Sequence, residues 1–307
     1  MPFRNSKPSR VAKNRKPVDP ELLADVDAIA RPYREAMQRL SEVVDEAVAT
    51  AAAQAGTLAN FQVVLTDAVV RALQDAIPRV SAPMTRVVFR DAVRALRGLP
   101  AGIGMGISFD KSDPRAVAWA RMRGSRMIAQ ITDEQMERIR VIISNAIANG
   151  VTVPEAAREI RQVVGLHDRW QRAVNNTYER NREALLRDGL KPERAMRVAA
   201  ERAERQRVKL IRARALNIAR TEIAAAQNYG TYLGWIEAGE KGLLNLSKTK
   251  KEWAAGPSGW KGINVCDFCA PLNGMRVPLT ASFPNGLLTP PAHPSCRCRM
   301  ILVPPEV

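Results

Sequence analysis

The sequence of 307 residues is poor in the side chains that active sites and membrane spans use most. It has two histidines, four cysteines and 5% aromatic residues, and it lacks the Gly-x-x-x-x-Gly-Lys-Ser/Thr pattern of a phosphate-binding loop. Its longest run without charge, residues 47–66, is rich in Ala, Gln, Asn and Thr and is too polar to cross a bilayer. The first 17 residues contain no apolar core of a signal peptide. We therefore expect that the protein has no membrane segment and that it is made and kept in a reducing cytoplasm.

Acidic residues are also scarce relative to basic ones. The chain has 47 Lys and Arg against 31 Asp and Glu, so its net charge is +16. The electrostatic field of such a charge attracts nucleic acid or an acidic protein surface. The alternative is a basic face that is only solvated and has neither partner. We expect residues 1–17 to form a disordered arm that contacts DNA or an acidic groove, or that only adds solubility. Its basic residues are Arg4, Lys7, Arg10, Lys13, Arg15 and Lys16.

Helical periodicity, abundant alanine and few aromatic residues predict a mainly α-helical protein. The periodicity is lost after Gly239, where short apolar runs predict small strands in an irregular, partly β module. The predicted regions are a basic arm at 1–17, a helical region at 18–97, a glycine-rich linker at 98–115, a helical domain at 116–239 and a cysteine-rich module at 240–307.

Capping and stop signals predict where individual helices begin and end. The spacing of Thr and Gln at 132–135 is that of a capping box, so we expect a helix to begin there and to end at Gly150. A second box at 152–155 predicts the start of the next helix. The other predicted features are breaks at Gly56 and near Pro78 and Pro83, and helices over 168–187 and 192–238.

All four cysteines and one of the two histidines lie within residues 266–298. Cys266 and Cys269 have the spacing that lets two thiolates hold one metal ion from a tight turn. With His293, Cys296 and Cys298, five side chains are available for the four positions of a tetrahedral ion. Because residues two apart in an extended segment point to opposite faces, we expect only one of Cys296 and Cys298 to be a ligand, with Cys298 favoured.

A structural Zn²⁺ is the interpretation that we favour for this cluster. So small a module cannot bury a large core, and a zinc ion held by four protein ligands would supply folding free energy. Such a site leaves no position for water and would not be catalytic. Disulfides, free buried thiols and a Cys–His nucleophile pair are the alternatives.

Three segments of the second half occur in a recognisable order. They are LNIARTEIAAAQNYGTYLGW at 216–235, VCDFCAPLNG around the first cysteine pair, and PPAHPSCRC around the second. Together they resemble the phage Mu F-like minor head proteins, also called head morphogenesis proteins, over roughly residues 130–303. The sequence departs from the family just before Cys266, where WKGIN stands in place of an expected acidic residue. Residues 1–115 carry no motif of the family.

The resemblance implies a minor capsid protein in the interior of a tailed-phage head, present in the host cytoplasm during assembly. The partners that it implies are the portal protein, other capsid proteins and phage DNA bound non-specifically, with a role in DNA packaging or ejection. The alternatives are a sequence-independent DNA-binding zinc protein that stays outside virions, and an enzyme, such as a toxin or nuclease, that carries a zinc module.

Polar residues of the long helix receive two different interpretations. Arg220 and Glu222 point about 200° apart on a helix, so they cannot act on one atom and we expect no enzymatic activity. We interpret Arg220, Thr221 and Glu222 as buried residues that fix this helix against the cysteine module. We expect contacts with DNA or a partner protein from the exposed side of the helix, at Arg202, Arg205, Arg212 and Arg214.

Overall fold

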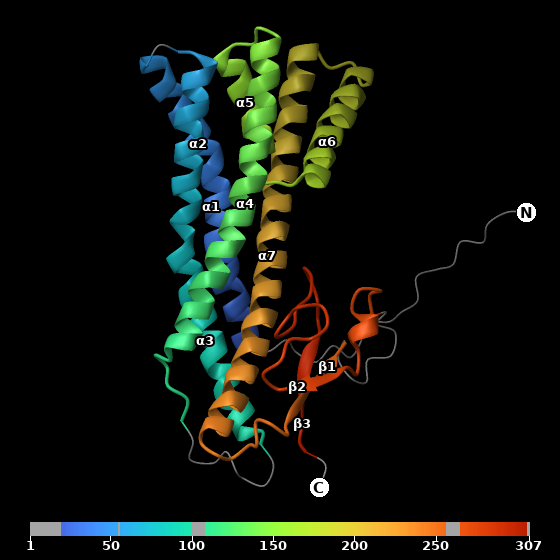
Figure 1. Cartoon of the computed structure of the whole chain (residues 1–307). Helices are drawn as coiled ribbons and strands as arrows, with labels where there is room; N and C mark the ends of the chain where they lie inside the picture. The colour runs from blue at the N-terminus through green and yellow to red at the C-terminus, as the bar shows by residue number, and fades with distance from the viewer. Residues whose placement is uncertain (1–19, 55, 100–107, 256–264, 306–307) are drawn as a thin grey trace, which may run out of the picture.

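Within the described residues, seven α-helices form an elongated bundle and a small sheet lies against its side (Figure 1). The computed structural model describes residues 20–54, 56–99, 108–255 and 265–305. The prediction of a mainly helical protein with a small β module at its end is confirmed. The elements are α1 (Pro20–Ala53), α2 (Leu58–Gln74), α3 (Ala76–Arg97), α4 (Pro114–Ala148), α5 (Val153–Val163), α6 (Asp168–Arg187), α7 (Pro192–Glu240), β1 (Lys250–Ala254), η2 (Ala270–Leu272), β2 (Arg276–Pro278) and β3 (Arg299–Val303).

The 49-residue helix α7 runs along the whole bundle and contacts α1, α3, α4, α6 and β3 (Figure 1). Its buried positions are mostly small residues, among them Ala215, Ala219, Ala226 and Ala238. Small side chains let neighbouring helices approach the backbone of α7 closely. The abundance of alanine in the sequence therefore serves the packing of several helices around a central one.

Helix α3 meets α7 with almost no side chain between the two backbones. A Cβ atom added at Gly230 would lie 2.2 Å from the carbonyl oxygen of Val88, and one at Gly234 would lie 2.5 Å from that of Ala92. Both distances are far below a van der Waals contact, and the clashing atoms are backbone atoms that cannot rotate away. Only glycine fits at these two positions of α7.

The helical regions predicted at 18–97 and 116–239 share one hydrophobic core. Val80 and Val87 of α3 belong to the same buried cluster as Ile128 of α4 and Ile223 of α7. Arg115 at the start of α4 lies 3.0 Å from Glu237 and 3.0 Å from Glu240 at the end of α7. The predicted arm at 1–17 and most of the predicted linker lie outside the described residues.

Proline has different effects at its two predicted breaks. The α2–α3 boundary falls at Asp75, and Pro78 occupies the first turn of α3, where a missing N–H costs no hydrogen bond. Pro83 lies inside α3 and is buried, so the prediction of a break there is wrong. The apolar face of α3 around Pro83 packs into the core, and tertiary packing outweighs the loss of one backbone hydrogen bond. The break at Gly56 is confirmed, with a positive φ of 64°.

The capping box predicted at 132–135 is wrong, because α4 continues through these residues. The Thr132 hydroxyl donates to the carbonyl of Ile128 at 2.8 Å, within the helix. Gln135 is fully buried, and its side-chain oxygen accepts from the N–H of Gly165 at 2.8 Å in the loop after α5. The apolar positions before Thr132 keep α4 helical, and the polar side chains serve tertiary contacts instead.

The second capping box is confirmed at the start of α5. The Glu155 carboxylate accepts from the Thr152 N–H at 3.0 Å and from its hydroxyl at 2.7 Å. These bonds hold the pKa of Glu155 below its ordinary value. Among the described residues, no helix combines the length and the apolar character needed to cross a membrane.

The contact between α3 and α7 gives a direct test of this packing. We expect Gly230→Ala to lower the free energy of unfolding by roughly 1–3 kcal/mol, because the added methyl group overpacks the interface and outweighs the better helix propensity of alanine. Urea unfolding followed by circular dichroism measures the change. Ala213→Ser, which adds one atom on the exposed side of α7, is the control and should shift the midpoint little. Equal stability of the two variants would contradict the contact.

Candidate metal centre

The sheet of the C-terminal module holds the loops that carry the cysteines. Strand β1 lies between β2 and β3, and both pairings are antiparallel. Trp253 of β1 is fully buried and meets the ring of Phe283 edge-on, with centroids 5.0 Å apart. The Lys251 ammonium is also buried and donates to the carbonyl of Leu288 at 2.8 Å. Burial lowers the pKa of Lys251 to about 8.

Cys266 and Cys269 form a tight turn that begins the cluster. The N–H groups of Cys269 and Ala270 both donate to the Cys266 carbonyl at 2.9 Å, and η2 follows directly. The turn leaves Cys266 exposed and Cys269 buried. Both thiols lie on the side of the turn that faces the second ligand group. The backbone N–H of Cys269 lowers the pKa of Cys266, while burial raises the pKa of Cys269 to about 12.

His293 points its Nε2 atom at both thiols of this turn. The distances are 3.1 Å to Cys266 Sγ and 3.2 Å to Cys269 Sγ. Its Nδ1 lies 2.9 Å from the Pro294 carbonyl, which accepts the Nδ1 proton. Because this bond places the proton on Nδ1, the lone pair of Nε2 is left free for a metal ion. The bond to Pro294 also raises the pKa of His293.

Cys296 and Cys298 are both buried, and both Sγ atoms lie within 4.8 Å of Cys269 Sγ. The prediction that they point to opposite faces is therefore wrong. The segment is not extended there: Ser295 has a positive φ of 61°, and the Cys296 N–H donates to the His293 carbonyl at 3.1 Å. This turn brings both thiols to one side. A hydrogen bond from the Cys298 thiol lowers the pKa of Cys296 to about 5 and raises that of Cys298.

The cluster offers one imidazole and four thiols that form no disulfide. Cys269 Sγ and Cys296 Sγ lie 3.8 Å apart. Two thiolates on one tetrahedral zinc ion, each at about 2.3 Å, would be about 3.8 Å apart. Cys269 belongs both to a group with Cys266 and His293 and to a group with Cys296 and Cys298. The five residues therefore fit a metal ion with sulfur and nitrogen ligands.

Helix α7 holds the second ligand group through three polar side chains on one of its faces. Asn228 donates to the Cys298 carbonyl at 3.2 Å and accepts from the Met300 N–H at 3.2 Å. The Thr221 hydroxyl accepts from the Ser295 N–H at 3.0 Å, and Asn217 accepts from the Ser295 hydroxyl. Sequence reasoning missed both asparagines. The signal was present: positions 217, 221 and 228 are spaced by four and seven residues, which places them on one face of a helix.

The three polar residues of the ARTE segment at 219–222 lie in three different environments. Thr221 is buried and contacts the module, as described above. Glu222 is fully buried but faces α4, where Arg123 Nε donates to it at 2.8 Å and Nη2 at 3.2 Å. Arg220 is exposed, so the prediction that it is buried is wrong. Consecutive helical positions point about 100° apart, so three neighbours cannot share one environment.

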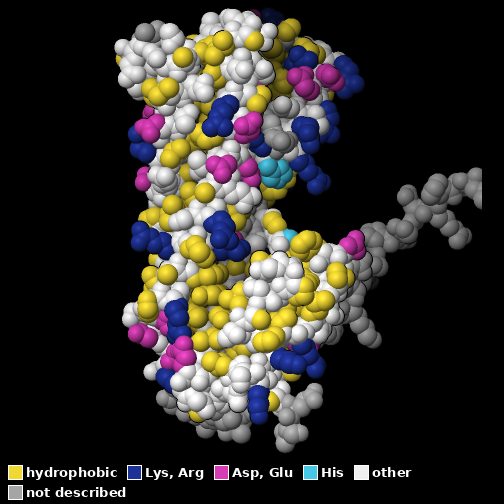
Figure 2. Space-filling model, in the orientation of Figure 1, with side chains coloured by type: hydrophobic (Ala, Val, Ile, Leu, Met, Phe, Trp, Pro, Cys, Tyr) yellow, Lys and Arg dark blue, Asp and Glu magenta, His cyan; other side chains and the backbone are white. Residues whose placement is uncertain are grey.

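Of the four arginines predicted on the exposed side of α7, three are exposed: Arg202, Arg205 and Arg212. Arg214 is 8% exposed, and the prediction for it is wrong. Its guanidinium lies 2.5 Å from Glu134 and donates to the Gly165 carbonyl at 3.2 Å. Lys and Arg side chains gather at the upper right of Figure 2, over α6.

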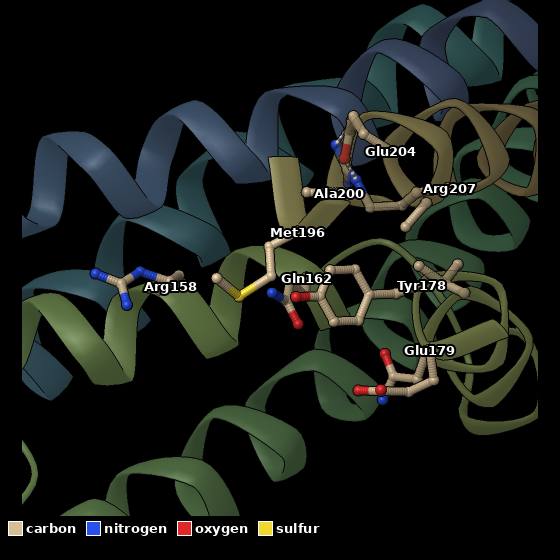
Figure 3. A pocket seen from close by; sticks show the side chains of 11 residues that line it. Arg158, Gln162, Tyr178, Glu179, Met196, Ala200, Glu204 and Arg207 are labelled. Carbon is tan, nitrogen blue, oxygen red and sulfur yellow. Dashed lines mark hydrogen bonds and ion pairs between the residues drawn. The ribbon is translucent and has the colours of Figure 1, made fainter. Parts of the chain in front are cut away.

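A separate cavity of about 630 Å³ lies between α5, α6 and α7 (Figure 3). Tyr178 and Met196 line it with apolar surface, and Arg207 lies at its edge. Arg207 is paired with Glu204 through two hydrogen bonds of 2.8 and 2.9 Å. With Arg158 and Glu179, the lining carries two basic and two acidic side chains. This cavity is therefore balanced in charge and far in sequence from the cysteines.

Comparison with known proteins gives one match. The family model described as Phage Mu protein F like protein matches residues 137–301, which is more than half of the chain. The match begins within α4 and extends to β3, so it includes α7 and all five cluster residues. No curated protein and no solved structure matches the chain.

The attachment of the cluster to α7 can be tested at Asn228. We expect Asn228→Ala to lower the free energy of unfolding by about 1–3 kcal/mol, because it leaves a buried carbonyl and a buried N–H without partners. Limited proteolysis should then cut residues 265–305 faster than in the parent protein. Gln227→Ala is the control, since Gln227 is half-buried on the same turn and its side chain forms no hydrogen bond with described residues. Equal cleavage of the two variants would rule out the anchoring role.

Proposed function

We propose that this chain, which belongs to the Phage Mu protein F like family of phage head morphogenesis proteins, is a minor structural protein of the virion that lies inside the head beside the portal. The observation that carries the proposal is the extent of the match. It covers a continuous part of the fold, from the second half of α4 through α7 to the cysteine cluster. Family membership supports association with the virion, and the position beside the portal is our proposal.

We propose that the basic surface of the protein contacts packaged DNA without sequence preference. The net charge of +16 supports this contact, because neutralising phosphates releases condensed counterions. The six basic residues of the arm at 1–17 and the exposed Arg202, Arg205 and Arg212 are the proposed contacts. Arg214 is not among them, because its charge is already paired with Glu134 inside the bundle.

We propose a structural and not an enzymatic role for the polar residues of α7. Glu222 is the fully buried acid of the ARTE segment. Its carboxylate accepts hydrogen bonds from Nε and Nη2 of Arg123. Arg220 lies on the exposed side of the same helix, so the two side chains do not converge on one substrate atom. Thr221 supports the loop that carries Cys296. These contacts hold elements in place.

We propose that Cys266, Cys269, His293 and Cys296 hold one zinc ion. Support comes from the free Nε2 lone pair of His293 and from the 3.8 Å separation of the Cys269 and Cys296 sulfurs. With four protein ligands, the zinc would act as a structural element that cross-links two loops of a small module. The chemistry that it supplies is folding free energy.

Cys298, which the sequence favoured as the fourth ligand, has a different place in this proposal. Its buried sulfur lies within 4.8 Å of the sulfurs of Cys269 and Cys296. We propose that Cys298 packs beside the ligand sulfurs and supports Cys296 without binding the zinc ion itself.

The zinc proposal predicts a difference between two neighbouring cysteines. Protein purified under reducing conditions should contain one zinc ion per chain by elemental analysis. Cys266→Ser and Cys296→Ser should each remove most of the zinc and make residues 265–305 sensitive to protease, because a lost ligand opens a site worth about 10–16 kcal/mol of apparent binding free energy. The helical signal at 222 nm should remain, since the bundle has its own core.

Cys298→Ser is the matched control, and it should retain close to one zinc ion per chain. Loss of zinc from Cys298→Ser with retention in Cys296→Ser would assign the fourth position to Cys298. Absence of zinc from the parent protein, with disulfides detected by mass spectrometry, would reject the metal site altogether.

The assembly proposal predicts that purified phage heads contain this protein in a lower copy number than the major capsid protein. It should be protected from protease in intact heads and digested after the heads are opened. Arg205→Glu with Arg212→Glu should reduce its incorporation severalfold, because both arginines are exposed on α7. Quantitative mass spectrometry of particles, normalised to the portal, measures the effect.

Arg121→Glu with Arg126→Glu is the matched control, with the same change in charge at exposed positions of α4. Equal loss in both pairs would indicate an effect of net charge alone. Absence of the protein from particles, with free protein in the lysate, would favour a DNA-binding protein that is not incorporated.

A further inference from the structure

A groove of about 870 Å³ runs along the junction between the bundle and the cysteine module. The beginning of α1, the second half of α3 and the middle of α7 form its bundle side. Residues 295–300, which lead from the metal cluster into β3, form its other side. This groove is the larger of the two cavities described here, and the proposed function assigns it no role.

The floor of the groove is apolar. Ile223 of α7 and Met300 of β3 are buried there, and Leu22 and Val26 of α1 are half-buried. Leu23 also lines the groove and is 54% exposed. An exposed leucine next to buried apolar side chains offers surface that an apolar side chain of a partner can cover.

The rim of the groove is basic. Its arginines are Arg94, Arg220, Arg297 and Arg299, and Asp91 is the single acidic residue in the lining. Asp91 is 6% exposed and lies 2.8 Å from Arg94, so its charge is already offset. Arg220 and Arg297 are exposed, and neither guanidinium forms a hydrogen bond or an ion pair with any described residue. The groove therefore presents unpaired positive charge above an apolar floor.

We propose that this groove binds an acidic amphipathic segment of another head protein, whose carboxylates pair with Arg220 and Arg297 while its apolar side chains cover Leu23. The charge of the rim and the chemistry of the floor together select this occupant. Duplex DNA would satisfy the arginines but offers the leucine no apolar contact. The arm at 1–17 of this chain is basic and would be repelled by the rim.

The inference rests on the proposed function only in placing the partner within the phage head. It deepens that function because it names a surface, a partner chemistry and a role for Arg220, the exposed member of the ARTE segment. The groove lies next to the cysteine cluster. Of the four proposed zinc ligands, Cys296 alone lines it. Peptide binding and incorporation into particles can therefore fail independently.

The test uses the full chain and peptides of about 20 residues tiled over the other head proteins of the same phage, a length that spans several helical turns. Fluorescence anisotropy measures binding of each peptide. We expect the bound peptides to be acidic and amphipathic. Arg220→Glu with Arg297→Glu should weaken binding about tenfold or more, because it turns two attractive contacts into repulsive ones. Leu23→Ser should also weaken it, with circular dichroism confirming that each variant is folded.

The control is again Arg121→Glu with Arg126→Glu, which should bind like the parent protein. A labelled DNA duplex is the second probe. If no peptide binds, if the bound peptides are basic, or if the Leu23→Ser variant binds unchanged, the proposal is overturned. Loss of duplex binding in the arginine pair, with no peptide bound, would assign the groove to DNA instead.

Discussion

The near-contact of the backbones of α3 and α7 at Gly230 and Gly234 is the constraint on which most of this structure depends. No side chain separates the two helices there, so the distance between them is fixed by backbone atoms. Because α7 also contacts α1, α4, α6 and β3, this fixed pair determines where the other elements pack. The C-terminal module is positioned by the same helix through Asn228, two residues before Gly230. A displacement of α7 would therefore move the bundle and the metal cluster together.

Buried charge pairs fix the remaining freedom of α7, which is rotation about its own axis. Glu222 faces Arg123 of α4, and Arg214 faces Glu134 and the loop after α5. Alanine and glycine surfaces alone would permit a helix to slide or rotate by one residue at small cost. An incorrect register would leave a buried charge without a partner, which costs about 3–5 kcal/mol. The apolar surface thus supplies most of the attraction, and the ion pairs select one arrangement.

The C-terminal module would gain order from two sources, its contacts with α7 and a bound metal ion. Its sheet has three short strands and a core around Trp253 and Phe283, so its own apolar burial is limited. The second ligand group is attached to α7 through Thr221 and Asn228, and zinc would join it to the turn of Cys266 and Cys269. The same junction forms the basic groove, so that a partner bound there would contact the bundle and the module at once.

The sequence by itself determined the helical class, the helices around α6 and α7, the cap of α5 at Thr152, and the group of five side chains that could hold a metal ion. These features depend on local spacing, which is readable in one dimension. Only the tertiary structure decided that Pro83 stays inside a helix, that residues 132–135 serve tertiary contacts, and that Arg214 is buried while Arg220 is exposed. It also decided that a turn at Ser295 brings Cys296 and Cys298 to the same side. The physical reason is the difference in free energy between the two kinds of interaction. A single helix cap contributes about 1 kcal/mol, and packing against distant elements contributes more.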